Sequence, residues 1–387
     1  MQRITRPRSV VGGLVAGAAS LALALSLTSC AGSAISKDQA PEAIANSLAN
    51  LTESTSFMSD DVNATIFEAL KRDPRLFYFY NGYNGTYAND GTAKVTWEYK
   101  HKDTPVSKVR LMGSVDDLAA IIGEASLKGE ATVAVVSSTS DLSPDGAKKA
   151  LSRLRSDGSL AALGIKDVTV GDGSSDYDGA LYAATVSIAY LTDVETVRDW
   201  RDRTEQRALE LAGELFGKGT PDYARELAIY RWVTDNARSQ ADPKVADTDH
   251  SGSTAYGALV EQAADSAGMA AAFQLLCEAA GIPCQTVAGT VGGEDRSWNL
   301  VSIGGSWYWV DAAAGILNAT SEQLRETHAW DEDASPVATA TAWNAEAVRT
   351  EGGKTADQAG ESEIDLAPTQ QRLAERFAAA RLSALPL

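Results

Sequence analysis

The sequence predicts an α+β protein, and two features of its first half indicate this class. Asn89-Asp90-Gly91 is a turn between the strand-prone runs Leu76–Tyr80 and Lys94–Tyr99, which predicts a β-hairpin. Further along, between residues 109 and 190, strand-like and helix-like segments alternate. Alternation of this kind, with a hairpin beside it, favours a sheet covered on one face by helices.

The elements before residue 191 follow from local signals. Ser59-Asp-Asp-Val62 is expected to begin a helix that ends before Asp73-Pro74. Ser114 caps a helix that runs to about 125, and Ser143-Pro144 begins another with proline in its first turn. The remaining segments are apolar and rich in β-branched residues, which predicts strands at 109–112, 131–136, 167–170 and 181–190.

Two longer helices follow. Thr192-Asp-Val-Glu195 has the spacing of a capping box and predicts a helix to about Phe216, with Trp200 and Leu211 on its apolar stripe. Thr220-Pro221 begins the next helix, which is expected to end near Asn236.

The N-terminus has the order of an export signal. Arg3, Arg6 and Arg8 precede an apolar segment from Val10 to Leu27, and small residues lead to Cys30. This order resembles a bacterial lipoprotein signal, which implies cleavage before Cys30 and attachment of acyl chains such as palmitate to it. An uncleaved membrane-spanning anchor is the alternative, because the apolar segment is long enough to cross a bilayer. Either way, we expect a membrane-anchored protein on the extracytoplasmic face of the cell membrane.

Charge and composition exclude several functions. The formal net charge is −18, and no cluster of basic residues balances it, so nucleic-acid binding is not expected. The three histidines and three cysteines form no spacing typical of a metal site. We therefore expect neither a metal nor a cofactor.

The segment from Ala255 to Asp311 carries the densest set of motifs. Gly268 follows shortly after Ser266, Gly281-Ile-Pro-Cys284 ends an Ala-rich stretch, and Trp298-Asn299 precedes Trp307-Tyr-Trp-Val-Asp311. This pattern resembles the bacterial transglutaminase-like domain, which has a papain-like cysteine-protease fold. The resemblance places Ser266 where the family has its catalytic cysteine, Arg296 where it has histidine, and Asp311 on its catalytic aspartate.

These substitutions imply an inactive site. Ser266 is expected to cap the following helix; the alternative is a serine nucleophile that needs a nearby base. Arg296 cannot be that base because a guanidinium keeps its protons and has no acceptor. We expect it to form an ion pair with Asp311 instead. His328 lies after the acid, where the resemblance places a non-catalytic histidine, and as a rescuing base it is the weaker alternative.

Two further features of the domain stay open. Cys277 and Cys284 flank a predicted helix end, and they either form a disulfide or remain thiols, because helix-end geometry often misses the required separation. Trp298, Trp307 and Trp309 alternate on two predicted strands, so one face of these strands is expected to belong to the core. The alternative is that Trp309 lines the former catalytic cleft, which could still hold a peptide or cell-wall ligand.

Together these features predict an organisation and a function. The predicted segments are a signal peptide (1–30), a tether (31–40), an α+β region (41–191), a connecting helix (192–219), the transglutaminase-like domain (220–332), and a polar linker with a short C-terminal helix (333–387). The expected function is a lipid-anchored binding or scaffolding module at the cell surface. The alternatives are a serine-dependent amide hydrolase or acyltransferase on peptide or cell-wall substrates, and a purely structural envelope protein.

Overall fold

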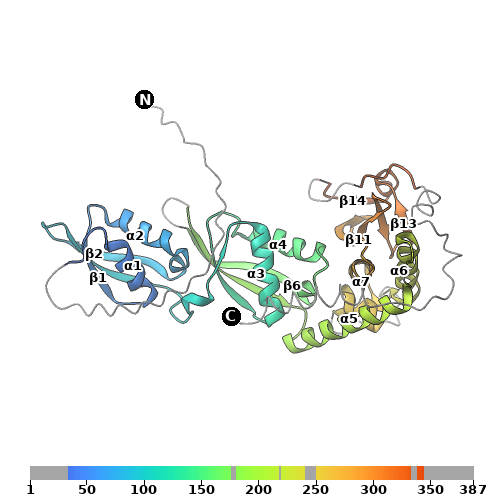
Figure 1. Cartoon of the computed structure of the whole chain (residues 1–387), viewed down its shortest axis with the longest axis horizontal. Helices are drawn as coiled ribbons and strands as arrows, with labels where there is room; N and C mark the ends of the chain where they lie inside the picture. The colour runs from blue at the N-terminus through green and yellow to red at the C-terminus, as the bar shows by residue number, and fades with distance from the viewer. Residues whose placement is uncertain (1–33, 176–179, 218, 240–249, 333–337, 344–387) are drawn as a thin grey trace, which may run out of the picture.

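The chain folds into three successive units, each built on its own sheet (Figure 1). The computed structural model describes residues 34–175, 180–217, 219–239, 250–332 and 338–343. The predicted signal segment with Cys30 and the predicted C-terminal helix lie outside these residues. In the part of the chain that is described, no helix is both long and apolar enough to cross a membrane. Mixed helices and sheets confirm the α+β class.

The N-terminal unit is a three-stranded antiparallel sheet in the order β1-β3-β2, with two helices on one face. Its elements are α1 (Ala40–Ala49), β1 (Ser54–Met58), α2 (Val62–Arg72), the 3₁₀ turn η1 (Pro74–Tyr78), β2 (Tyr80–Tyr87) and β3 (Thr92–Tyr99). The hairpin predicted at Asn89-Asp90-Gly91 is confirmed as the β2–β3 connection.

The strand predicted at Leu76–Tyr80 is wrong for most of its length. Asp73 accepts a hydrogen bond from the backbone N–H of Arg75, and Pro74 follows with its fixed φ, so a 3₁₀ turn forms instead. This turn is buried in the core together with Leu76, Phe77 and Tyr78. The apolar run therefore reflects burial of the turn and not the alternation of a strand.

The middle unit is a four-stranded mixed sheet in the order β4-β5-β7-β6. Both predicted helix starts are confirmed, since Ser114 and Ser143 each accept a hydrogen bond from a backbone N–H three residues on. The elements are η2 (Val106–Lys108), β4 (Arg110–Met112), α3 (Val115–Lys128), β5 (Thr132–Ser137), α4 (Pro144–Ser156), η3 (Leu160–Ala162), β6 (Ile165–Ser175) and β7 (Tyr182–Tyr190).

Strand β5 is buried on both faces and joins the first two units. Val133 and Val135 pack with the core under α3 and α4, whereas Ala134 and Val136 pack with the core of the N-terminal unit. Side chains alternate between the two faces of a strand, so one apolar run can serve two cores. The hydroxyls of Tyr78 and Thr185 lie 2.8 Å apart across this junction.

The C-terminal unit holds three longer helices against a five-stranded antiparallel sheet in the order β13-β12-β11-β10-β14 (Figure 1). The helices are α5 (Val194–Leu215), α6 (Asp222–Asn236), α7 (Ser266–Ala280) and the short α8 (Ser321–Leu324). The sheet strands are β10 (Cys284–Val291), β11 (Glu294–Ile303), β12 (Ser306–Asp311), β13 (Ile316–Ala319) and β14 (His328–Trp330). The connection from α6 to α7 contains β8 (Arg238–Ser239), η4 (Ser251–Ser253), the π-turn η5 (Gly257–Glu261) and β9 (Ala263–Ala264).

The two faces of this sheet have different cores. On β11, Val301 and Ile303 belong to the core around α7, whereas Trp298 and Leu300 belong to a separate core on the opposite face with Trp309. The position of a residue along β11 or β12 therefore decides whether it can meet α7.

A buried arginine fixes the C-terminal unit to the middle unit. The guanidinium of Arg201 on α5 donates to the carbonyl oxygens of Ser126, Ala161 and Leu163. Burial lowers the pKa of Arg201 to about 10, so the group remains charged at neutral pH. The start of α5 corrects a prediction in the same region, because Asp193, and not Thr192, accepts the capping hydrogen bond, from Thr196.

Candidate functional site

Helix α7 begins at Ser266, the residue that the resemblance places at the nucleophile position. Asp265 is the N-cap, and its carboxylate accepts hydrogen bonds from the backbone N–H groups of Ala267 at 2.8 Å and Gly268 at 3.0 Å. Ser266 is therefore the first residue of the helix and not its cap, which corrects the sequence-based expectation. A carboxylate accepts both N–H groups together and favours the positive end of the helix dipole.

Gly268, two residues after Ser266, shows how closely this end of α7 is packed. A Cβ atom on Gly268 would lie 2.2 Å from the carbonyl oxygen of Gly252. Only glycine allows η4 to approach the first turn of the helix at this distance. Gly268 thus allows the turn η4 to pack directly against the first turn of α7.

Ser266 lies at the buried start of α7, and its hydroxyl has a backbone partner. Its side chain is buried, with the residue 7% exposed, and its Oγ accepts a hydrogen bond from the backbone N–H of Ser297 at 3.3 Å. Among the described residues, no imidazole or carboxylate is hydrogen-bonded to this hydroxyl. A serine hydroxyl attacks a carbonyl only when a base within hydrogen-bond reach takes its proton.

Arg296 does not pair with Asp311, so the expected ion pair is wrong. The guanidinium lies 2.7 Å from the carboxylate of Glu294, two residues away on the same strand, and the Arg296 side chain is 42% exposed. Asp311 is only 3% exposed. Pairing with it would require burial of the guanidinium, whereas Glu294 offers a partner without loss of hydration.

Asp311 is instead held by His328. His328 Nε2 lies 3.1 Å from Asp311 Oδ2, and Asp311 Oδ1 accepts a hydrogen bond from the backbone N–H of Ala314 at 2.9 Å. The second ring nitrogen of His328, Nδ1, lies 2.7 Å from the hydroxyl of Thr327. Both nitrogens of the imidazole are therefore engaged, and the structure brings together two residues that the sequence separates by a whole strand.

Aromatic rings enclose this pair. The rings of Trp298 and His328 meet edge to face at 4.8 Å, and Trp330 packs against both Trp298 and Trp309. Trp309 is 1% exposed, and its indole N–H donates to Ser321 Oγ at 2.9 Å. Trp309 thus belongs to a closed aromatic core, as the alternation of the tryptophans predicts, and does not line a cleft.

A buried carboxyl lies on α6, where sequence analysis proposed no functional residue. Glu226 is 0% exposed, and its Oε2 accepts a hydrogen bond from the side-chain amide of Asn318 at 3.0 Å. Burial raises the pKa of Glu226 to about 8, so the carboxyl is mainly neutral at pH 7. A sequence signal existed, because Glu226 lies at helical spacing from Ile229 and Val233 on the buried stripe of α6.

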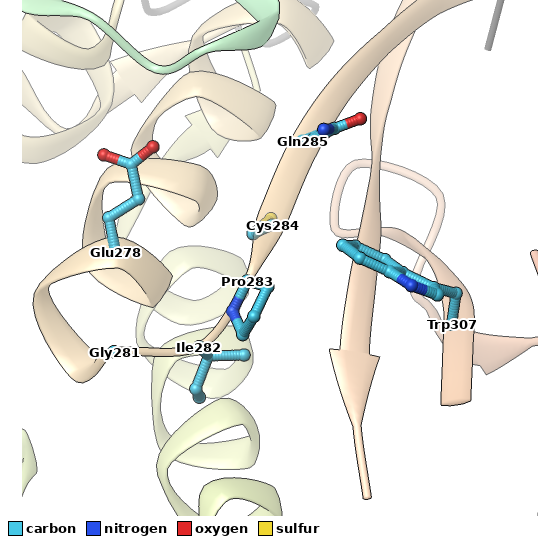
Figure 2. Close-up of a pocket in the computed structure, with 7 residues that line it drawn as sticks. All are labelled: Glu278, Gly281, Ile282, Pro283, Cys284, Gln285 and Trp307. Atoms are coloured by element: carbon cyan, nitrogen blue, oxygen red, sulfur yellow. The ribbon is translucent and has the colours of Figure 1, made fainter. Parts of the chain in front are cut away.

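A pocket opens at the other end of α7 (Figure 2). Its volume is about 310 Å³, and its lining consists of Glu278, Gly281, Ile282, Pro283, Cys284, Gln285 and Trp307. Figure 2 shows Glu278 on the helix side and Trp307 on the β12 side of the segment that connects α7 to β10. Because α7 has 15 residues, this end lies about 22 Å from Ser266 along the helix axis.

Cys277 and Cys284 both belong to this end of α7, and both are free thiols. The side chains of Cys284 and Cys277 are neighbours in the same core. Burial, together with this contact, raises the pKa of the Cys277 thiol well above its ordinary value. In the described part of the chain, no group of three or more potential ligands could hold a metal ion.

Comparison with known proteins identifies the domain that carries these residues. Residues 209–335 match the family model of the transglutaminase-like superfamily, so the chain contains a transglutaminase-like domain. The domain limits expected from the sequence, 220–332, lie inside this match. No curated protein sequence matches the chain.

Two solved structures show weak similarity. One is a candidate cysteine protease from Cytophaga hutchinsonii, with 20% identity, a TM-score of 0.24, and coverage of 38% of this chain and 65% of the other. The second is a TGase, with 12% identity, a TM-score of 0.24, and coverage of 60% of this chain and 65% of the other. The chain thus spans just under two thirds of the length of each.

Proposed function

We propose that the protein is a lipid-anchored, extracytoplasmic binding or scaffolding module whose transglutaminase-like domain does not catalyse acyl transfer. One observation carries the proposal. Asp311, the acid of the family's triad, is hydrogen-bonded to His328 and to a backbone N–H, while the one partner of Ser266 within the described residues is a backbone N–H. In the described part of the chain, the acid and the nucleophile position thus share no hydrogen-bond partner.

The chemistry of the three positions supports the loss of activity. A working site needs a group that removes a proton from the nucleophile and is itself oriented by the acid. Arg296 stands in that place, keeps its protons at any physiological pH, and points to an exposed carboxylate. The fold is preserved while the proton transfer step is absent.

The pocket at the C-terminal end of α7 supports a binding role. Its volume falls near the lower end of the range of small-ligand sites, which is roughly 300–1,000 Å³. The indole ring of Trp307 flanks it, and the face of an aromatic ring attracts ammonium groups. Glu278 lies on the helix side, where its carboxylate accepts a hydrogen bond from the side-chain amide of Gln274. A peptide or cell-wall fragment with a free amine suits this chemistry, and the net charge of −18 would draw it towards the protein.

The anchor is proposed from the sequence at the N-terminus. Arginines, an apolar segment and small residues lead to Cys30 in the order of a lipoprotein signal. Two or more acyl chains on one residue hold a protein stably at a membrane. Metabolic labelling with a palmitate analogue tests this, because the label should enter the native chain and not a Cys30→Ser variant.

A hydroxyl-dependent hydrolase or acyltransferase is the second candidate, and one observation favours it. Thr327 Oγ1, His328 Nδ1, His328 Nε2 and Asp311 Oδ2 form a continuous hydroxyl–imidazole–carboxylate chain, and Thr327 is exposed. The order of groups is that of a catalytic triad. In this version the nucleophile would be Thr327, since Ser266 does not meet the imidazole.

One set of assays separates the candidates. The native protein is tested for ammonia release from glutamine peptides and for cleavage of cell-wall peptides, beside the variants Ser266→Ala and Thr327→Ala. The proposal predicts that none of the three exceeds the blank. Native activity that Thr327→Ala abolishes would support the second candidate, and native activity that Ser266→Ala abolishes would support the serine enzyme.

Binding is tested separately at the pocket. A short peptide with a free lysine amine is titrated into the native protein and into Trp307→Ala, and affinity is measured by calorimetry. We expect the variant to bind at least about tenfold more weakly, because it loses the aromatic wall. Tyr87→Ala, on the exposed face of β2 in the N-terminal unit, is the matched control and should bind as the native chain does. Equal affinity of native protein and Trp307→Ala would remove the pocket from the proposal.

A further inference from the structure

The turn that ends α7 places two cysteines side by side. Gly281 adopts a left-handed conformation with φ of 75°, and the backbone N–H of Ile282 donates to the carbonyl oxygen of Cys277 at 2.8 Å. This C-cap turns the chain back along the last turn of the helix. Pro283 then leads directly into β10, whose first residue is Cys284. The contact between the two thiols is thus a consequence of how the helix ends.

The two thiols differ in access. Cys277 is 0% exposed and lies in the core shared by α5, α6 and α7. Cys284 is 7% exposed and forms part of the wall of the pocket (Figure 2). A molecule that enters the pocket therefore meets Cys284 before it could meet Cys277.

We propose that Cys284 and Cys277 form a thiol–disulfide exchange site at this pocket, with a small-molecule disulfide as the substrate. Cys284 is the attacking thiol, and Cys277 is the resolving thiol. The site is independent of the triad positions, which lie at the opposite end of α7, and it does not rest on the function proposed above.

Two balanced steps complete the reaction. The Cys284 thiolate, its proton released to solvent, attacks one sulfur of R–S–S–R, so a Cys284–S–S–R bond forms and RS⁻ leaves and takes up a proton. Cys277 then attacks the Cys284 sulfur of this mixed disulfide, and its proton passes to the second leaving group, RSH. Two protein thiols are oxidised to one disulfide, and the substrate disulfide is reduced to two thiols. No other oxidant is required.

The order of attack follows from burial. The pKa of Cys277 is raised by its surroundings, so this sulfur is a poor nucleophile until a mixed disulfide is already in contact with it. The product would join the last turn of α7 to the start of β10. It would also replace the thiol in the pocket wall, so the state of the cysteines would change the shape of the pocket.

The test uses the full chain in a Cys30→Ser background, so that only these two cysteines remain. The protein is treated with glutathione disulfide, quenched at intervals, alkylated and analysed by peptide mass mapping. We expect a glutathione adduct on Cys284 to appear first, followed by a product that lacks two hydrogens and has no alkylated cysteine. Alkylation of both cysteines in samples that are quenched and then denatured would show that neither thiol was oxidised, and would overturn the proposal.

Matched variants test the assigned roles. Cys277→Ala should stop at the glutathione adduct on Cys284, and Cys284→Ala should leave Cys277 unmodified. An adduct on Cys277 in the Cys284→Ala variant would refute the order of attack. If Cys277→Ala does not fold, the time course of the protein that keeps both cysteines tests the order of attack. A Cys277–Cys284 disulfide that forms with no earlier glutathione adduct on Cys284 would also refute that order. The same treatment in concentrated urea should modify either cysteine, which shows that the order comes from the fold.

Discussion

The two ends of α7 differ in the groups that lie around them. At its N-terminus Gly268 packs against η4, and within the described residues the hydroxyl of Ser266 accepts a hydrogen bond only from a backbone N–H. At its C-terminus no family triad residue is present, yet a pocket, a thiol pair and an aromatic wall meet. The comparison shows that the motif positions of the family lie at one end of the helix, whereas the pocket and the two thiols lie at the other.

The largest expected effect concerns the buried carboxyl of Glu226 on α6, the helix that packs beside α7. Its pKa is about 8 in the folded protein and about 4.3 in the unfolded chain, so the folded state binds the extra proton between these values. The contribution of Glu226 to the free energy of unfolding is therefore fully present below the pKa of the unfolded chain, and it is lost as the pH rises through the folded-state pKa of about 8. From pH 4 to pH 9, the free energy of unfolding of Glu226→Gln should rise relative to the native chain by on the order of 5 kcal/mol.

Urea unfolding at several pH values measures this difference. Glu278→Gln, on the neighbouring helix, serves as the comparison for removal of a less buried carboxyl. A constant difference between Glu226→Gln and native protein across this pH range would show that Glu226 ionises normally.

The next effect compares how much two pairs contribute to the free energy of unfolding: the buried pair His328–Asp311 and the exposed pair Arg296–Glu294. His328→Ala leaves the Asp311 carboxylate without its side-chain donor in a closed core, which should cost about 3–5 kcal/mol of unfolding free energy. Arg296→Ala removes an exposed ion pair and should cost less than about 1 kcal/mol. Chemical denaturation of both variants gives the comparison. Equal losses would contradict the assignment of Asp311 to His328.

The smallest effect distinguishes two adjacent residues at the start of α7. Asp265→Ala removes the N-cap and should cost about 1 kcal/mol, within the usual range for capping residues. Ser266→Ala removes one weak acceptor and should cost less, and thermal unfolding of the two variants compares them. A larger loss for Ser266→Ala would restore the serine as the main cap.

Much of the fold follows from local signals in the sequence. Turn chemistry at Asn89-Asp90-Gly91 and the proline at residue 144 give correct elements, because they depend on backbone preferences within a few residues. The run Leu76–Tyr80 misleads because its apolar character reflects burial in a turn rather than strand alternation. Propensity alone does not distinguish these cases.

The candidate site is predictable in its positions but not in its contacts. The motif places Ser266, Arg296 and Asp311 on α7, β11 and β12, yet it cannot tell which partner a carboxylate selects. His328 reaches Asp311 from β14, a strand that follows the motif, and Glu294 competes locally for Arg296. The cost of burying a guanidinium decides this choice, and burial becomes visible only in the folded structure.

The central claim is that no hydroxyl in the former catalytic site is activated, and covalent labelling tests it most directly. The folded native protein is treated with a fluorophosphonate, which reacts with activated serine and threonine hydroxyls, and intact and peptide masses are measured. We predict no adduct on Ser266 or Thr327, as in a heat-denatured control. A stoichiometric adduct on either residue that forms only in the folded protein would contradict the account.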